Sequence, residues 1–374
     1  MSTDLLTAAR DLRATIDRNA RAAPDATALP RATVDALVAA GLHGTNVPRA
    51  VGGAELPLVD AIDVFAEVAR ADGSAGWSLM ASATTAAFFA AWAGDGLVER
   101  MFGDGVPLCA GQFAPNGTAV RAGDAWIVNG DYQFGSNIDA ATWVGAGTLT
   151  QPPEGSDEQP DLLFAIFPAD CVERRGNWHV LGLRATASED YAVRDVKVPD
   201  DSTFRLFAPV RHRGGSVYEL GVLGLTTVGH SAFALGVIRR ALDELVDIAR
   251  TKHRMGAAAP LRESERFLHA LGTLECRALA NEALVRAEFA AAQARVESID
   301  RPDPKVVNRL RAVTVQVTQD GADIVRQCYL LAGTTGLREG PLERCFRDIH
   351  AGTQHFFASP AGPIDLGRDL LAST

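Results

Sequence analysis

The spacing of apolar residues changes twice along this chain of 374 residues. In the first part, residues such as Leu5, Leu12 and Ile16 recur at helical intervals, which predicts amphipathic helices. Short β-type runs separated by Gly, Asp, Asn and Pro follow, and long helical runs then return. We therefore expect an α+β protein with an N-terminal helical domain (residues 1–105), a central antiparallel β domain (residues 106–205) and a C-terminal helical bundle (residues 206–374).

Individual residues predict some of the helix limits. Pro30 suits the start of the second helix and Gly41 its end. Another helix is expected over residues 58–70. Near the C-terminus, the segment Arg301-Pro-Asp-Pro304 predicts a turn, followed by a helix over residues 305–331.

Two long stretches carry no charged residue, residues 73–94 and 220–238. Each is long enough to suggest a membrane span. Both are rich in Gly, Ala, Ser and Thr, and the second contains His230. Such composition favours tightly packed, buried helices, so we expect no membrane span.

The overall charge argues against nucleic acid as a partner. The formal net charge is −10, and no stripe of Lys and Arg is present to neutralise phosphates. The five cysteines are odd in number and form no CxxC motif, so we expect neither a disulfide framework nor a metal site. The N-terminal residues lack the pattern of a signal peptide. We expect a cytoplasmic protein whose partners are small molecules or other proteins.

The twelve-residue segment Arg344–His355 carries two of the chain's eight histidines beside an Arg/Asp pair. His350 and His355 lie on a Gly-containing turn that follows an Arg347/Asp348 pair. Histidine can supply or take a proton near neutral pH because its unperturbed pKa is about 6.5. From the residues alone, a packed histidine that is satisfied by a backbone carbonyl is the favoured interpretation of His355. We expect His350 to be structural or to face solvent.

Several motifs resemble the acyl-CoA dehydrogenase superfamily, and the resemblance covers essentially the whole chain. Val51-Gly-Gly-Ala-Glu55 looks like a glycine-rich link of that family. Gly182-Leu-Arg-Ala-Thr-Ala-Ser188 and Val196-Lys-Val-Pro199 are similar to its Gly-x-Arg-x-Thr-x-Ser and Val-x-Val-Pro motifs. The resemblance implies a helical, β, helical fold, a flavin cofactor (FMN or FAD) and a homotetramer built on the C-terminal helices.

Within that superfamily, details look more like the two-component flavin-dependent monooxygenases of the p-hydroxyphenylacetate hydroxylase oxygenase type. The segments that carry this likeness are Gly111–Gly117, Asn129–Asn137 and Pro341–Asp348, the last followed by His355. The resemblance implies that Ser136 lies near flavin N5 and His355 near flavin C4a, as catalytic residues. It also implies that the flavin is contacted by Gln112, Phe134, Ser136 and Asn137.

The dehydrogenases differ in needing a carboxylate that removes a substrate proton. The position where they commonly carry a catalytic glutamate is Ala351 here, and no Asp or Glu occurs over residues 349–362. The alternative location, residues 220–242, contains no acid either. Oxygenation instead needs a neutral hydrogen-bonding group such as Ser136 beside N5 and a proton-handling group such as His355. We therefore expect oxygenation rather than dehydrogenation.

The remaining candidates each have two interpretations. Gly333-Thr334-Thr335-Gly336 resembles the family's Gly-Gly-x-Gly, which implies contact with flavin phosphate, from its own or a neighbouring subunit; alternatively it only ends a helix. Lys252 and Arg254 either bind an adenine-side group or form a solvated cationic face. Four aromatic residues either line a substrate pocket or pack in the core: Trp77, Phe88, Phe89 and Trp92.

We therefore expect oxygenation of an aromatic or polycyclic small molecule. No Gly-x-Gly-x-x-Gly follows a strand, so the chain has no evident nicotinamide site and a separate flavin reductase is expected to supply the reduced flavin. An N-oxygenase acting on an amine or amino sugar is an alternative of the same superfamily. An acyl-CoA dehydrogenase with a relocated base and a non-catalytic flavin-binding relative are further alternatives.

Overall fold

The computed structural model describes residues 2–153, 155, 157–253, 255, 259–298 and 303–372. Its N-terminal part is helical, as predicted, and the short helix over 31–39 begins after Pro30 and is followed by Gly41 with a left-handed φ of 70°. The helices of this part are α1 (Ser2–Ala22), α2 (Arg31–Ala39), α3 (Leu58–Ala71), α4 (Gly73–Trp92) and α5 (Asp95–Phe102).

Helix α4 is the buried centre of the N-terminal domain. Every residue of it except Ala81 is buried, which confirms that residues 73–94 form a packed core helix. Its first turn is capped by Asp72, whose side chain accepts a hydrogen bond from the N–H of Ala75 across 3.0 Å. The aromatic residues of its second half pack against the β domain, so α4 connects two domains.

The central domain is one sheet with the strand order β5-β6-β2-β1-β3-β4-β7. The expectation that it is purely antiparallel is wrong, because β1 pairs with β3 in parallel. Strand β2 returns antiparallel to β1, and the connection over residues 136–142 reverses the chain again before β3 begins on the other side of β1. The strands are β1 (Cys109–Ala122), β2 (Ala125–Gly135), β3 (Trp143–Gln151), β4 (Leu162–Pro168), β5 (Glu173–Arg174), β6 (Glu189–Pro199) and β7 (Thr203–Arg205).

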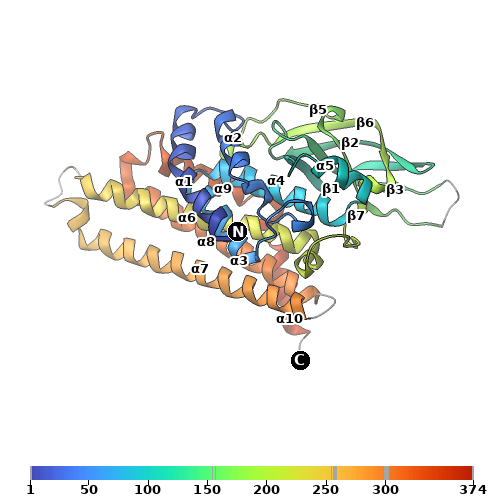
Figure 1. The fold of residues 1–374 in the computed structure, drawn as a ribbon. Coiled ribbons are helices and arrows are strands. Elements are labelled where there is room, and N and C mark those ends of the chain that lie inside the picture. The colour runs from blue at the N-terminus through green and yellow to red at the C-terminus, as the bar shows by residue number, and fades with distance from the viewer. Residues whose placement is uncertain are drawn as a thin grey trace.

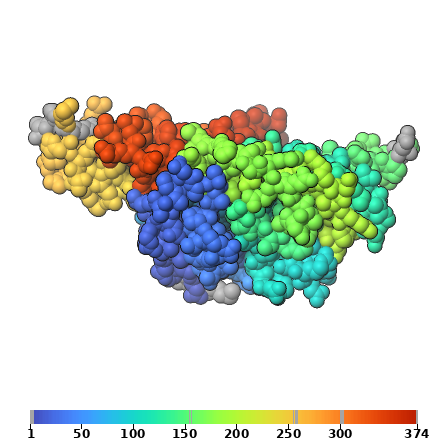
Figure 2. Space-filling view, turned by 90° about the horizontal axis from the view of Figure 1, so that it is seen from above, coloured from blue at the N-terminus to red at the C-terminus, as the bar shows by residue number. Residues whose placement is uncertain are grey.

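The C-terminal helices form a bundle whose central member, α6, packs against α3, α4, α8 and α9. Figure 1 shows the sheet at one end of the molecule and the long helices α7 and α8 extending away from it. Figure 2 shows the N-terminal helices lying against both the C-terminal helices and the β domain. The helices are α6 (Gly221–Thr251), α7 (Glu265–Ser298), α8 (Pro304–Ala332), α9 (Pro341–Gly352) and α10 (Ala361–Leu371).

The predicted C-terminal turn lies between α7 and α8, although Arg301 and Pro302 are outside the described residues. In the described part of the chain, one helical segment, residues 216–251, is long and apolar enough to cross a bilayer. Of its most apolar window, 83% is buried inside the protein, as in a core helix.

Candidate active site

Side chains from α4 and from two loops of the β domain form a continuous line of hydrogen bonds. The indole N–H of Trp77 donates to Ser136 Oγ across 3.2 Å, and Ser136 Oγ lies 2.8 Å from Ser188 Oγ. Ser188 Oγ lies 2.7 Å from Thr186 Oγ1, whose hydroxyl donates to the carbonyl oxygen of Leu183 across 2.8 Å. We call Ser136, Ser188 and Thr186 the hydroxyl chain. It joins the helical core to the loop that precedes β6.

The backbone around the hydroxyl chain is strained. Among the described residues, six non-glycine residues have a positive φ, and four of them flank this chain: Phe134 (60°), Asn137 (66°), Leu183 (56°) and Ala187 (45°). The N–H of Asn137 also donates to the carbonyl of Thr186 across 2.8 Å and so fastens the two loops together. Such conformations cost about 1–3 kcal/mol each and cluster at functional sites.

Two histidines meet beside Trp77. The ring centroids of His230, on α6, and His355, just after α9, are 4.3 Å apart. The centroid of Trp77 lies 5.0 Å from that of His230 and 5.4 Å from that of His355. Phe357 closes the group, 5.1 Å from His230. The two imidazoles therefore sit in an aromatic surrounding next to the hydroxyl chain.

Both imidazoles are neutral at physiological pH. Burial lowers the pKa of His355 to about 4, and burial together with the neighbouring His355 lowers the pKa of His230 well below its usual range. The backbone N–H of Phe357 donates to His355 Nδ1 across 3.4 Å, which places the ring proton on Nε2. Neither ring nitrogen of His230 has a hydrogen-bond partner in the described structure.

Gln112 is positioned by a buried tyrosine. The hydroxyl of Tyr191 accepts from the N–H of Gln112 across 3.1 Å and donates to the carbonyl of Gly145 across 2.9 Å. The side-chain Oε1 of Gln112 accepts from the N–H of Gln133, the residue before Phe134, across 3.0 Å. These bonds hold the ends of β1 and β2 together where the chain leads into Ser136.

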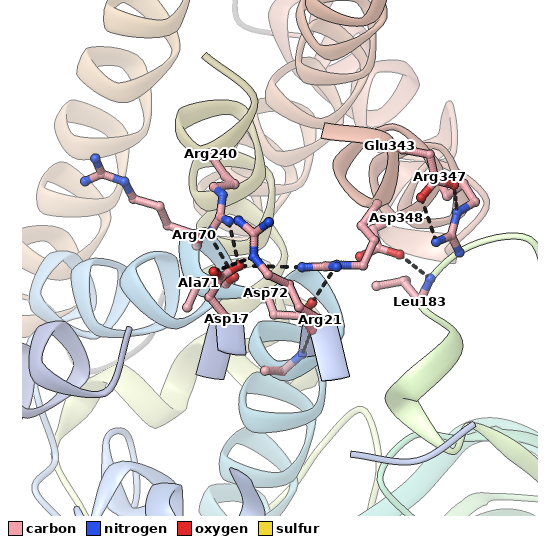
Figure 3. Close-up of polar contacts among 12 residues, drawn as sticks. Asp17, Arg21, Arg70, Ala71, Asp72, Leu183, Arg240, Glu343, Arg347 and Asp348 are labelled. Carbon is pink, nitrogen blue, oxygen red and sulfur yellow. Dashed lines mark hydrogen bonds and ion pairs between the residues drawn. The ribbon is translucent and has the colours of Figure 1, made fainter. Parts of the chain in front are cut away.

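A buried carboxylate ties α9 to the same part of the β domain (Figure 3). Asp348 is 3% exposed, and its Oδ1 accepts from the N–H of Leu183 across 2.6 Å. A Cβ on the preceding Gly182 would lie 2.0 Å from the carbonyl oxygen of Arg347, so only glycine permits this approach of loop to helix. The carbonyl oxygen of Leu183 accepts the hydrogen bond at the end of the hydroxyl chain, and Leu183 is anchored to α9 through Asp348.

Charged residues surround this anchor. Arg344 lies 3.4 Å from Asp72 and 3.6 Å from Asp17. Arg240 donates to Asp17 across 2.6 Å (Figure 3). These contacts link α1, α4, α6 and α9. Burial, and then the nearby carboxylate of Asp72, raise the pKa of Asp348 to about 7.

The structure assembles only some of the predicted site. Trp77, Ser136 and His355 meet, with Phe134, Asn137 and Gln112 in the flanking strands and loops. The other three aromatic candidates lie in the contact between α4 and the sheet, where they are at most 2% exposed: Phe88, Phe89 and Trp92. Their contact with a substrate stays a prediction.

The turn over Gly333–Gly336 is distant from this cluster within one chain. It follows α8 at the end of the bundle away from the sheet (Figure 1). Lys252 Nζ donates there to the carbonyl of Ala332 and to Thr335 Oγ1, each across 2.6 Å. Arg254 lies outside the described residues. A flavin contact by this turn stays a prediction and would require a second subunit.

His350 is structural, as expected. Its Nδ1 lies 2.6 Å from the carbonyl oxygen of Phe346, and its ring packs on that of Phe346. By contrast, the sequence did not predict that His230 lies beside Trp77 and His355. The available signal was a lone titratable residue in an otherwise uncharged helical stretch, which on its own indicates only a core histidine.

Sequence comparison places the chain in a family. The N-terminal domain of acyl-CoA dehydrogenases matches residues 4–97, and their C-terminal domain matches residues 228–360. The chain belongs to the acyl-CoA dehydrogenase family. The β domain lies between the two matched segments, so the order of parts agrees with the helical, β, helical arrangement of the structure.

Proteins similar to this chain include monooxygenases. An indole-3-acetate monooxygenase of Pseudomonas putida is 28% identical, over 92% of this chain and 88% of the relative. The oxygenase subunit HsaA of a flavin-dependent monooxygenase from Mycobacterium tuberculosis is 26% identical, over 95% of this chain and 92% of the relative. The solved structure of XiaF from Streptomyces sp., in complex with FADH2 and glycerol, superposes with a TM-score of 0.86 at 19% identity, covering 100% of this chain and 96% of XiaF. Other matching structures hold FMN.

Proposed function

We propose that this protein is the oxygenase component of a two-component flavin-dependent monooxygenase that hydroxylates an aromatic small molecule. The full-length similarity to monooxygenases supports the reaction class. The observation that carries the proposal is the meeting of His230 and His355. It brings together the two segments in which a dehydrogenase of this family would place its carboxylate base, and each of these segments carries a histidine and no carboxylate near the contact.

The residues around the hydroxyl chain fit a flavin ring. An isoalloxazine is flat and largely apolar, with hydrogen-bonding atoms along one edge. Phe134 is 58% exposed beside Ser136, so a flat ligand would cover a large apolar side chain that the described structure leaves open. Ser136 and Gln112 supply hydrogen-bonding groups along the same edge. We assign Gln112, Phe134, Ser136 and Asn137 to cofactor binding.

Once bound, reduced flavin supplies the electrons that activate O2. The protein's part is to position groups and to handle protons. Ser136 offers a hydroxyl oxygen that cannot act as a base, so it does not withdraw a proton from its partner. Neutral His355 presents Nε2–H and can donate a hydrogen bond to a developing oxygen anion. The aromatic surrounding of the two imidazoles keeps water away from them.

The same surrounding favours an aromatic substrate. Trp77, His230, Phe233 and Phe357 present ring faces and edges, with Trp77 and Phe233 in edge contact at 5.1 Å. Planar rings pack well in such a group, whereas a sugar offers many hydroxyls that this wall cannot pair. The unpaired nitrogens of His230 can bind one polar substituent. An N-oxygenase acting on an amino sugar is therefore the weaker alternative.

We also propose a homotetramer and a separate reductase as partner. Large apolar side chains are exposed on the C-terminal helices, which suits contact between subunits, and a neighbouring chain could bring the Gly333–Gly336 turn to the flavin. A relative is named as an oxygenase subunit, which supports delivery of reduced flavin by another protein.

The test separates oxygenation from dehydrogenation. Purified protein is supplied with reduced FMN or FADH2 by a flavin reductase, under labelled O2, with indole-3-acetate, indole or p-hydroxyphenylacetate as probes. We expect incorporation of one labelled oxygen atom into a probe, detected by mass spectrometry. A parallel anaerobic sample with oxidised flavin receives a short-chain acyl-CoA. Bleaching of the flavin there, without oxygen incorporation in the first experiment, would overturn the proposal.

A further inference from the structure

We propose that Thr186 and Ser188 are positioning residues that fix the direction of hydrogen bonding along the hydroxyl chain, so that Ser136 faces the flavin as an acceptor and the site prefers reduced over oxidised flavin. This inference rests on the proposed function. It assigns a role to two residues that lie behind Ser136 and need not touch the cofactor themselves.

The two ends of the hydroxyl chain each allow one direction only. At one end the indole nitrogen of Trp77 carries a proton and no available lone pair, so it can only donate to Ser136. At the other end the carbonyl oxygen of Leu183 can only accept, so the 2.8 Å contact with Thr186 must contain the Thr186 proton. Two oxygens this close without a proton between them would repel each other.

The direction of the inner bonds then follows. The only proton of Thr186 is used on Leu183, so Ser188 must donate across the 2.7 Å contact to Thr186. The proton of Ser188 is used in turn, so Ser136 must donate across the 2.8 Å contact to Ser188. Ser136 Oγ receives the Trp77 proton on one lone pair and keeps the other free. Towards a ligand, Ser136 is therefore an acceptor.

Burial makes this direction stable. Thr186 is 1% exposed and Ser188 is 3% exposed, so water has little access to exchange partners with them. The loop is held by the Asn137–Thr186 backbone bond and by the bond from Leu183 to Asp348. Reversing the chain would leave two oxygens facing each other at its carbonyl end. Ser136 cannot turn its proton outward without breaking the sequence of bonds behind it.

The consequence concerns the redox state of the cofactor. Reduced flavin carries a proton on N5 and can donate to Ser136, whereas oxidised flavin has a bare N5 that only accepts. An acceptor that faces an acceptor in a buried site loses the hydrogen bond on both sides. We expect reduced flavin to bind about tenfold or more tightly than oxidised flavin. In a two-electron couple, each tenfold difference raises the potential of the bound flavin by about 30 mV.

The test measures the dissociation constants of FMN or FAD in both redox states, anaerobically, and takes their ratio. Thr186→Val keeps the shape of the side chain but removes the hydroxyl, and Ser188→Ala interrupts the chain at its middle. Either variant frees Ser136 to donate, so we expect the preference for reduced flavin to fall by about tenfold. Thr186→Ser retains the hydroxyl and should keep the wild-type ratio.

Thr148→Val is the matched control. Thr148 is also a buried threonine of the β domain whose hydroxyl donates to a carbonyl, that of Leu163 across 2.9 Å, but it lies outside the hydroxyl chain. Thermal unfolding shows whether each variant is folded. If Thr186→Val does not fold, Ser188→Ala alone provides the test. The inference would be overturned if folded Thr186→Val and Ser188→Ala kept the wild-type ratio of the two dissociation constants, or if that ratio were near one in the wild type. Either result would leave the oxygenase assignment intact. A wild type that binds flavin in neither state would overturn both.

Discussion

The carboxylate of Asp348 on α9 accepts a hydrogen bond from the backbone N–H of Leu183, and the carbonyl of that same Leu183 receives the last proton of the hydroxyl chain. One residue of the β domain, held at a left-handed φ of 56°, therefore connects a buried acid to the site around Ser136. The bond to Asp348 fixes the loop in this strained conformation. The protonation state of Asp348 is consequently linked to folding.

Replacing Asp348 with Asn should change the pH dependence of stability. Because the pKa of Asp348 is raised from 3.8 to about 7, the folded state keeps a proton that the unfolded state loses between these values. The free energy of unfolding of the wild type should therefore fall as pH rises from about 4 to about 7, relative to Asp348→Asn. The expected relative slope is up to about 1.4 kcal/mol per pH unit, measured by urea unfolding.

Asp323→Asn is a suitable control for that measurement. Hydrogen bonds from Arg326 and Arg277 lower the pKa of Asp323, so it stabilises the folded state above its unfolded pKa and loses that contribution as pH falls. The two variants should thus alter the pH profile with opposite signs. Equal profiles for wild type and Asp348→Asn would show that this carboxyl group does not hold a proton in the folded state.

Replacing His355 with Ala should remove a hydrogen-bond donor to the developing oxygen anion. We expect product formation to slow by roughly 10²-fold with the fold retained, as measured in single turnovers with pre-bound reduced flavin. Because the pKa of His355 is lowered to about 4, ionisation of His355 should not affect the wild-type rate near pH 6.5. The pH profiles of wild type and variant should therefore have the same shape around that pH. His350→Ala, which removes a histidine five positions away, should retain most of the activity. A similar loss in both variants would argue for structural damage instead.

Removing the hydroxyl of Ser136 should uncouple oxygen consumption from product formation. In Ser136→Ala the flavin edge loses its acceptor, so we expect more H2O2 per reduced flavin consumed, measured with a peroxidase assay. Ser231→Ala is a matched control, because Ser231 is buried and bonded to Thr314 but belongs to α6. An H2O2 yield equal to that of the wild type would place Ser136 away from the reactive edge.

Assembly can be tested on helix α7. Leu279 is 54% exposed, and burying it against another subunit would account for an apolar residue at this position. Light scattering should give a tetramer for the wild type, and Leu279→Asp should shift the mass towards smaller species. Val38→Asp changes a residue of similar exposure on α2 and should keep the wild-type mass. A monomeric wild type that binds flavin would contradict the proposed assembly.

Local sequence patterns predicted the helices and strands better than they predicted which of these elements contact one another. Helix limits such as Pro30 and the run over residues 305–331 follow from backbone preferences and periodicity, and the structure agrees. The parallel pairing of β1 with β3 did not follow, because alternation within a strand is the same whichever way its neighbour runs. Contact between His230 and His355 depends on how α6 packs against α9, which is a tertiary property.

The same holds for the hydroxyl chain. Ser136, Thr186 and Ser188 belong to motifs that the sequence shows. The order of their hydrogen bonds, however, depends on the approach of two loops, which the Asn137–Thr186 backbone bond holds together. Hydroxyl groups of Ser and Thr bond to many local partners, so no spacing rule selects this arrangement.

The site draws on Trp77, Ser136, Ser188, His230 and His355, which belong to all three domains and are far apart in the chain. Each of the three domains by itself carries only some of these residues. An isolated β domain or C-terminal bundle would be expected to bind flavin poorly, even if it folded. Conversely, a ligand held by all three domains stabilises the folded chain as a whole, so retained flavin would report on the integrity of the entire protein.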